Sequence, residues 1–499
     1  MYIILIIASI IILLCVLLSK ALHRFGVPSL LIFVVLGMLA GMVIRTIMRG
    51  GGFGGIFTDD ASVTEAIPVD TIASFALVFI MFYGGFATKW ETAKPVALRA
   101  GIMSSLGTII TAFGIASFCF VIFNVPFLYG LLFGSVVSST DAASVFSILR
   151  SRKLNLKGGL APLLEIESGS NDPFSYMLTI ISITALQAQG SGMSLTQLIK
   201  LILIQITAAL IIAALASVLA VLLLKRLNLE NTGFYPILIF AIIMMSFSIC
   251  TLVNGNGLLC VYITGIVVGN NKFSHKKHTV QFFDSISWLM QIVLFFMLGL
   301  ISHPSMLPAI AVEGTILSVL LIIVVRPVAT ALILSWFKTP IKQQIFVSWV
   351  GLRGAASIAF AIIATEALEG SLPYDLFHLV FYVALFSVMV QGTLIPFAAK
   401  KLDLIDDSDE NAVMKTFTDY FDGVSTQLYE YKVEEGDTFA GKSITDANIP
   451  QDMLIIMIKR KNKVIVPKGT TQIIKNDVLV VSGQDFSFFT DEKAAFGSA

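Results

Sequence analysis

The chain has 499 residues, of which 56% are hydrophobic and 13% charged, and its formal net charge is +1 at pH 7. Soluble domains average roughly 45–50% apolar and about 25% charged residues, so this composition excludes an ordinary soluble protein and indicates membrane lipid as the solvent. The near-zero net charge gives no attraction for nucleic acid, and no nucleic-acid partner is expected. Four cysteines lie inside apolar runs without metal-ligand spacing, and we expect buried thiols at Cys15, Cys119, Cys250 and Cys260.

Thirteen apolar segments predict membrane-spanning helices, because a helix needs roughly 20 apolar residues to cross a bilayer. In chain order these segments are 2–19, 28–45, 70–88, 100–123, 127–149, 161–187, 197–224, 233–253, 257–269, 281–301, 308–337, 344–365 and 375–399. We therefore predict an all-α polytopic membrane domain over residues 1–401.

The distribution of basic residues predicts the orientation of these spans. Lys20 and Arg24 follow the first span and no basic residue precedes it, which favours an N-terminus outside the cell over a cleaved signal peptide. The loops that this orientation places inside carry most of the lysines and arginines, whereas the outward loops and span ends hold Arg45, Arg49 and Lys200. We expect a protein of the cell (plasma) membrane whose C-terminal part is cytoplasmic.

The fifth span contains a row of four side-chain oxygen groups at Ser138, Ser139, Thr140 and Asp141. Such side chains bond to nearby backbone and compete with the helix, so we predict an interrupted helix whose freed backbone lines an ion cavity. The alternative is a continuous helix with back-bonded hydroxyls and a satisfied aspartate.

The sixth span carries polar residues on neighbouring strips of one helix face. Glu167 lies four residues before Asn171, Ser168 lies four before Asp172, and Glu165 lies seven before Asp172. Such a set of oxygen groups suits a monovalent cation. A structural polar network without transport is the alternative, and Glu165, nearer the cytoplasmic end, is also compatible with a solvated funnel residue.

The twelfth span contains Arg353 between Gly351 and Gly354, which predicts a second interrupted helix. This span runs opposite to the fifth, and two interrupted spans of opposite direction are typical of an inverted repeat with the substrate site at their crossing. Asp141 and Arg353 would then each compensate half-helix ends of opposite partial charge.

The segments STDAAS, ESGSNDP and GLRGA, in this order and on these spans, resemble the monovalent cation/proton antiporters, specifically their NhaP-type branch. The resemblance implies exchange of a monovalent cation for H⁺ by alternating access, by a homodimeric transporter that is not an enzyme and needs no cofactor. It also implies a core of spans four to six and eleven to thirteen that moves against a dimerisation domain. Because Asn171 replaces a second acid, we expect electroneutral exchange of one proton for one cation.

The resemblance also assigns roles around the predicted cation site. Asp172 resembles the essential ion- and proton-binding carboxylate, Thr140 and Ser168 its oxygen ligands, and Asn171 the other half of the asparagine–aspartate pair. Asp141 is expected beside them.

Glu167 resembles an acid that forms a buried ion bridge with an arginine one span before the GLRGA helix, which here is Arg326. A pair between Glu167 and Arg353 is the alternative. The third span departs from parts of this branch, because residues 81–86 (MFYGGF) include no carboxylate, which leaves the ligands from that side open.

After Lys401 the composition changes from apolar to polar. Residues 402–424 are acidic and predict a linker, 425–485 predict a small cytoplasmic α+β domain, and 486–499 form a tail. Its expected strands are LYEYKVEE, MLIIMIKR, VIVP and VLVVSG, with a short helical piece at SITDAN. This domain resembles the TrkA-C (RCK-C) module of potassium transporters and channels, which implies dimerisation and regulation by a small ligand, and favours K⁺ over Na⁺ as the cation.

Two other functions are alternatives. An ion channel gated by the cytoplasmic domain would need a selectivity filter, and no TVGYG-like segment is present. An intramembrane hydrolase would need a nucleophile paired with a base, whereas the five histidines fall at or near span ends or in loops.

Overall fold

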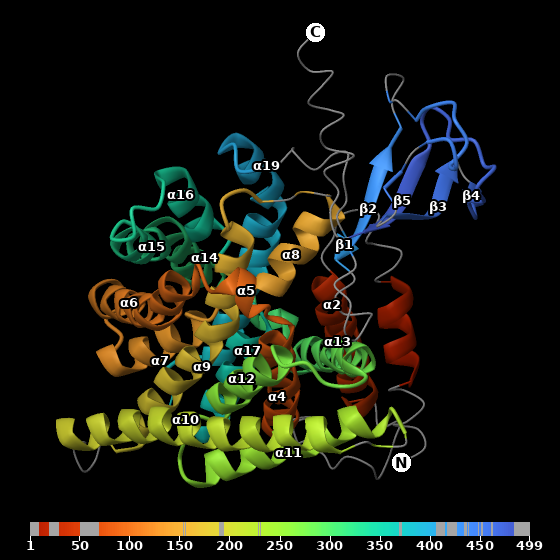
Figure 1. Cartoon of the computed structure of the whole chain (residues 1–499). Coiled ribbons are helices and arrows are strands. Elements are labelled where there is room, and N and C mark those ends of the chain that lie inside the picture. Colours follow the sequence, from red (N-terminus) through yellow and green to blue (C-terminus); the bar gives the residue numbers. More distant parts are fainter. Residues whose placement is uncertain are drawn as a thin grey trace. The chain divides into compact units, whose positions relative to one another are not determined.

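The computed structural model describes residues 9–18, 29–49, 69–152, 154, 156–188, 194–227, 229, 231–368, 372–405, 415–416, 427–433, 437, 439–447, 449–450, 453–460 and 463–483. They belong to two compact units, Met1–Ile405 and Asp406–Ala499 (Figure 1). The expectations for Lys20, Arg24, most of the linker and the tail lie outside the described residues.

The first unit is helical, and most of its helices overlap predicted spans. After a short helix at Ser9–Leu18, they are α2 (Ser29–Arg49), α4 (Val69–Ala87), α5 (Trp90–Ala93), α6 (Ala97–Phe123), α7 (Phe127–Val137), α8 (Ala142–Ser151), α9 (Leu160–Gln187), α10 (Leu195–Arg226), α11 (Phe234–Leu252), α12 (Gly257–Gly269), α13 (Lys276–Ile301), α14 (Ala311–Leu320), α15 (Arg326–Leu334), α16 (Ile341–Trp349), α17 (Ala355–Ala367), α18 (Leu376–Phe386) and α19 (Thr393–Lys401). Among the described residues, 7 helices are long and apolar enough to cross a membrane, with α14–α15 and α18–α19 each counted as one. The chain is a helical membrane protein, and the total of thirteen spans stays a prediction.

Both predicted helix interruptions are present. The helix of the fifth segment ends with α7 and resumes with α8 after four residues, and that of the twelfth ends with α16 and resumes with α17 after five. The two breaks touch directly, because the N–H of Asp141 donates to the carbonyl oxygen of Leu352 at 2.8 Å. A backbone bond between segments more than two hundred residues apart fixes the crossing of the two broken helices.

Two π-helical turns, Leu321–Val325 and Ser387–Gly392, lie inside the last long helices and were not predicted. Each is followed by a proline, Pro327 or Pro396. A proline has no N–H for the carbonyl four residues earlier and its ring crowds that carbonyl, so a widened turn before it relieves both problems.

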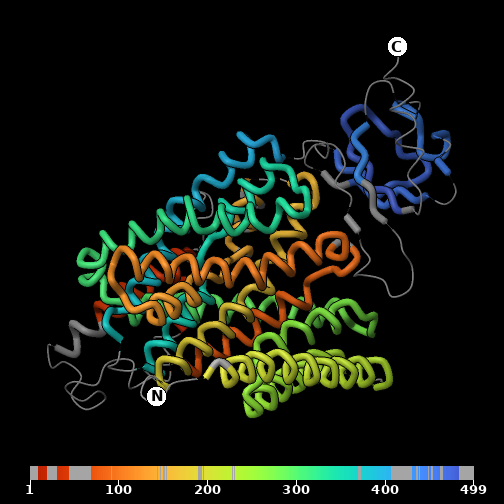
Figure 2. The backbone as a smooth tube through the Cα atoms, turned by 90° about the vertical axis from the view of Figure 1, so that its left-hand side faces the viewer, coloured from red at the N-terminus to blue at the C-terminus, as the bar shows by residue number. Residues whose placement is uncertain are grey.

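Helices α10 and α11 lie side by side along one edge of the helical unit (Figures 1 and 2). Many of their large apolar side chains are exposed, including Leu203, Leu210, Leu215 and Ile237. In water such a continuous apolar surface would drive association, whereas in a bilayer it contacts acyl chains at no cost.

Helices α4 and α12 pack backbone against backbone. A Cβ at Gly85 would overlap the carbonyl oxygen of Tyr262, and a Cβ at Gly265 or Gly269 would overlap a carbonyl of α4, at Phe82 or Phe86. Glycines at these positions therefore set the close approach of the two helices, as small residues do in membrane helix pairs. We call this contact the α4–α12 seam.

The second helix makes a similar contact within the same chain. A Cβ at Gly37 would overlap the carbonyl oxygen of Phe296 and lie 2.9 Å from the Cα of Gly299. Gly37 and Gly41 lie four apart on the second helix, a small-residue spacing that by itself is weak evidence for a dimer face. The structure instead directs Gly37 toward α13 of the same chain.

The second unit contains an antiparallel sheet with strand order β1-β2-β5-β3-β4. Its strands are β1 (Lys415–Thr416), β2 (Gln427–Lys432), β3 (Leu454–Arg460), β4 (Lys463–Ile465) and β5 (Val478–Gly483). Their alternating apolar residues, such as Tyr431, Ile458 and Leu479, form a separate small core.

The predicted helical piece at SITDAN is wrong for the residues that the structure describes there, because Ser443 forms an isolated β-bridge with Gln472 and residues 444–447 form turns. Ser443 Oγ accepts from the N–H of Asp446 at 3.3 Å and donates to its carboxylate, a local pattern that competes with helix. In its described part the unit is thus a small sheet domain rather than α+β.

Candidate functional site

Helix α9 packs against α6, α7, α12 and α17, and it carries the buried acids of the helical unit. Asp172 lies near its middle and is 6% exposed. The hydroxyl of Ser139, in the break between α7 and α8, donates a hydrogen bond to its carboxylate. The predicted carboxylate and the predicted helix interruption are therefore brought together.

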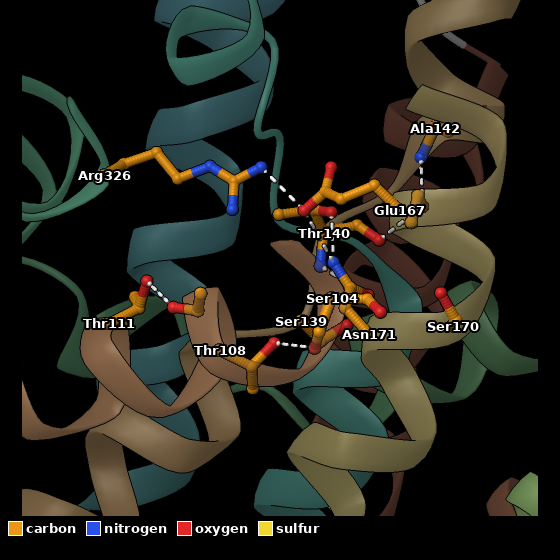
Figure 3. Close-up of polar contacts among 12 residues, drawn as sticks. Ser104, Thr108, Thr111, Ser139, Thr140, Ala142, Glu167, Ser170, Asn171 and Arg326 are labelled. Carbon is orange, nitrogen blue, oxygen red and sulfur yellow. Dashed lines mark hydrogen bonds and ion pairs between the residues drawn. The ribbon is translucent and has the colours of Figure 1, made fainter. Parts of the chain in front are cut away.

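Two further polar residues of α9, Ser168 and Asn171, join this helix to the same break, and Figure 3 shows Asn171 directed toward Thr140. Ser168 Oγ donates to the carbonyl oxygen of Thr140 at 2.7 Å and accepts from the N–H of Ala142 at 2.8 Å. Asn171 accepts from the N–H of Thr140 at 3.3 Å and donates from its amide to Thr140 Oγ1. Backbone groups freed by the interruption thus find partners on α9, as burial requires.

Asp141 is directed toward the start of α8. Its carboxylate accepts from Ser144, from the N–H at 3.2 Å and from the hydroxyl at 2.6 Å, which is the geometry of a helix N-cap. A Cβ at Gly354 would overlap the Asp141 side chain, so only glycine there allows the two breaks to meet. The negative charge lies at the positive end of α8, as helix-dipole compensation requires.

Arg353 is buried at the same crossing, with 1% exposure. Its Nη1 donates to the carbonyl oxygen of Ser139 at 2.8 Å, just beyond the C-terminal end of α7. Its Nε and Nη2 have no hydrogen-bond partner among the described residues. The positive charge of Arg353 thus lies at the negative end of the opposite half-helix.

Glu167 forms an ion pair with Arg326, and the sequence had left two arginines open as its partner. Arg326 Nη2 lies 2.8 Å from Glu167 Oε1, and each side chain is only 3% exposed (Figure 3). Arg326 begins α15 directly after the first π turn, and Arg353 bonds to Ser139 instead. The charge of Glu167 is therefore already compensated within the protein.

The sequence did not single out the polar residues of the last span. Gln391 Nε2 donates to the carbonyl oxygen of Trp349 at 2.9 Å, at the end of α16, and Ser387 donates to Gln391 while accepting from the N–H of Arg353 at 3.3 Å. Two polar residues four apart in an apolar span were the available signal. Ser139 was noticed in the polar row, but the sequence alone gave it no role beside Asp172.

Among the described residues, no group of three or more His, Cys, Asp and Glu side chains is arranged to hold a metal ion. Around Asp172 the structure combines one carboxylate with neutral hydroxyls, an amide and backbone groups. One negative charge with neutral oxygens balances a singly charged ion, whereas Ca²⁺ or Zn²⁺ sites usually combine several anionic ligands.

The comparison with known families decides the identity of the helical part. Residues 9–401 match the family described as "Sodium/hydrogen exchanger, transmembrane". The chain belongs to the sodium/hydrogen exchanger family. Residues 428–485 match the TrkA-C domain, so this exchanger-family chain carries a TrkA-C domain after its helical unit.

Characterised relatives align with most of this exchanger-family chain. It is 31% identical over 476 residues to the K(+)/H(+) antiporter NhaP2 of Shewanella sp. (strain ANA-3), covering 95% of this chain and 79% of the relative. It is 36% identical over 391 residues to the K(+)/H(+) antiporter NhaP of Alkalimonas amylolytica, covering 76% and 63%. The solved structure of the sodium proton antiporter MjNhaP1 from Methanocaldococcus jannaschii matches with a TM-score of 0.66 at 18% identity, over 79% of this chain and 100% of that one, and shares its fold.

Proposed function

We propose that the chain exchanges a monovalent cation for a proton across the cell membrane, and that Asp172 binds either one in turn. The observation that supports this most directly is the state of its buried carboxylate. Within the described part of the chain no lysine or arginine pairs with it, and the hydroxyl that donates a hydrogen bond to it, that of Ser139, is neutral. A buried carboxylate without a resident counter-ion is stabilised by a bound proton or cation.

The other charges of the crossing support the same reading because each already has a compensating partner. Glu167 is paired with Arg326, Asp141 caps α8, and Arg353 lies at the end of α7. Exchange of one proton for one cation at Asp172 then leaves the net charge of the site unchanged. We therefore propose electroneutral exchange.

Neutral oxygens near Asp172 are suited to complete the coordination of the cation. Thr140 carries a hydroxyl in the break and Ser168 carries one on α9 beside it, and Asn171 orients Thr140 through two hydrogen bonds. We propose Asp172, Ser168 and Thr140 as direct ligands and Asn171 as the residue that holds them in place. Asp141 adds negative potential from the start of α8.

The names of the relatives support potassium as the cation. Two relatives that align with most of this chain are K(+)/H(+) antiporters, whereas the matching fold belongs to a sodium proton antiporter. We propose K⁺ as the preferred cation and Na⁺ as a weaker one. The TrkA-C domain would then adjust the exchange rate on the cytoplasmic side, in a homodimer with its N-termini outside.

Proteoliposomes with an internal pH-sensitive dye test the proposal. Adding KCl or NaCl outside acid-loaded vesicles should move protons in wild-type vesicles and not in Asp172→Asn vesicles. Loss of the pH gradient that depends on an imposed voltage and needs no cation gradient would instead indicate a channel. Absence of any cation-driven proton movement in the wild type would contradict the proposal.

A further inference from the structure

One strip of α9 joins the exposed and the buried acid of that helix. Glu165, Gly169, Asp172 and Tyr176 follow at intervals of four, three and four residues, so they lie along the same side of the helix. Glu165 is exposed, whereas Asp172 is buried. Gly169 lies between the two acids along this strip.

The phenol of Tyr262, from α12, lies against this strip at Gly169. A Cβ on Gly169 would be 3.0 Å from Cε2 of the Tyr262 ring and 3.1 Å from its hydroxyl oxygen. The charges of Glu165 and Asp172 both act on the phenol, and the hydroxyls of Thr88 and Ser170 lie beside it. Glycine at position 169 thus allows the hydroxyl to approach the α9 backbone between the two carboxylates.

The hydroxyl of Tyr262 is buried and lacks a partner. The residue is 3% exposed, and its hydroxyl forms no hydrogen bond with any residue that the structure describes. An unsatisfied buried hydroxyl is unfavourable, and such groups in native proteins usually have a role or a bound species that satisfies them. Tyr235, buried on neighbouring α11, contrasts with it, because that hydroxyl bonds the backbone of Leu227 and Leu229, each at 3.3 Å.

We propose that the Tyr262 hydroxyl is an additional ligand for the cation, contributed by α12, which holds it between Glu165 and Asp172. This inference rests on the proposed exchange at Asp172 and adds a residue from the opposite side of the site. The third span, which has no carboxylate at residues 81–86, leaves that side without an acid. A neutral phenol oxygen supplies coordination there without adding charge, so the exchange stays electroneutral.

The backbone of α12 is well suited to present this ligand. At the α4–α12 seam the carbonyl of Tyr262 itself lies against Gly85. The phenol is therefore carried by a rigid helix pair, while Asp172 lies on α9 beside the interrupted helices. A cation that binds both would contact the two groups of helices at once.

The test is the variant Tyr262→Phe, which removes one oxygen and keeps the ring that packs on Gly169. Reconstituted protein should show an apparent KM for K⁺ raised about tenfold, the size expected when one contact to a charged group is lost. Its maximal rate should stay within about twofold of wild type, and its pH profile should shift because protons would compete against a more weakly bound cation. Tyr235→Phe is the matched control and should keep the wild-type KM and pH profile.

A second variant reaches the same contact from α9. Gly169→Ala inserts a methyl group against the phenol and should raise the KM for K⁺ by displacing the hydroxyl. Wild-type KM values and pH profiles in both Tyr262→Phe and Gly169→Ala would overturn the inference, provided that wild-type vesicles exchange. Wild-type vesicles without exchange would instead contradict the proposed function, so the two failures are distinguishable.

Discussion

Two buried carboxylates on different sides of α9 have opposite kinds of partner. Glu167 and Asp172 are five residues apart, which places them about 140° apart around the helix axis. On one side Glu167 meets a permanent cation, Arg326, at 2.8 Å. On the other side Asp172 meets the hydroxyl of Ser139, and the phenol of Tyr262 lies nearby without a partner.

The difference separates a structural charge from an available one. A carboxylate paired with a buried arginine is compensated at all times, because the guanidinium does not lose its proton at physiological pH. A carboxylate with neutral partners is stabilised only when a proton or a cation binds to it. The same helix therefore carries one acid that supports the fold and one that is proposed to do the exchange.

The largest expected effect is at the available acid. Asp172→Asn keeps the size of the side chain and an oxygen that accepts from Ser139, but it removes the charge that a cation or proton needs. Cation-driven proton movement should fall to the level of empty liposomes, while the melting temperature in detergent stays close to wild type. Asp403→Asn, at an exposed carboxylate 3.5 Å from Lys157, is the control and should exchange normally. Substantial exchange by Asp172→Asn would show that Asp172 is not the exchanging acid, and the contrast with Glu167 would then fail.

The next effect is on stability, at the paired acid. Glu167→Gln or Arg326→Leu leaves one buried charge without its partner, which typically costs about 3–5 kcal/mol. We expect a much lower melting temperature and less protein in the membrane for each single variant. The double variant Glu167→Leu with Arg326→Leu should recover part of the loss, since no charge is then left uncompensated. Single variants as stable as wild type would show that the pair is not structural.

A third paired carboxylate, in the sheet domain, extends the comparison. Asp477 is fully buried and accepts two hydrogen bonds from Arg460 at 2.8 Å each, and these bonds raise the pKa of Arg460 above its usual value. Arg460→Gln should destabilise this domain by about 1–3 kcal/mol, less than in the membrane core, because Ile474 still donates to Asp477 and Arg460 is partly exposed. Limited proteolysis of the full chain should then cleave faster within residues 428–485, with the helical unit unchanged.

The smallest effect is expected at Asp375, which caps α18 directly before the apolar helix Leu376–Lys401, one residue short of it, and is half exposed. Burial raises the pKa of Asp375, but hydrogen bonds from the ring and N–H of His378, with the charges of His378 and His303, outweigh it and leave the pKa below its usual value. A lowered folded-state pKa stabilises the fold above the unfolded pKa, near 4, and this contribution is lost as the pH falls through the folded value. Asp375→Asn should therefore reduce the drop in melting temperature between about pH 5 and pH 3. An unchanged acid transition would show that His378 does not stabilise the charged form.

The sequence predicted the elements of this comparison better than their contacts. The segment 257–269 is helix α12, and both breaks lie where hydroxyls, an aspartate or glycines weaken the helix. The choice between Arg326 and Arg353 depended on which side chain crosses to α9, a tertiary fact that spacing on one helix does not contain. The sequence likewise did not predict the unpartnered hydroxyl of Tyr262, because a tyrosine in an apolar span usually serves to pack against neighbouring helices.

Local competition explains the remaining misses. The two π turns follow from Pro327 and Pro396, whose effect on the preceding turn depends on whether the surrounding helices tolerate a bulge. SITDAN contains good helix-capping residues, but the side chains of Ser443 and Asp446 bond to each other, and this local turn does not continue into a helix. Neither outcome is fixed by hydrophobic periodicity.

The glycines of the α4–α12 seam also determine where the protein is stiff. Because carbonyl groups lie where side chains would be, at Gly85, Gly265 and Gly269, there is no layer of flexible atoms to deform when one helix is pushed along the other. A small sliding step would drive backbone into backbone, so the pair must translate as one piece. In the proposed exchange cycle, shear would then be concentrated on surfaces lined by movable side chains, such as the contact of Tyr262 with Gly169 of α9.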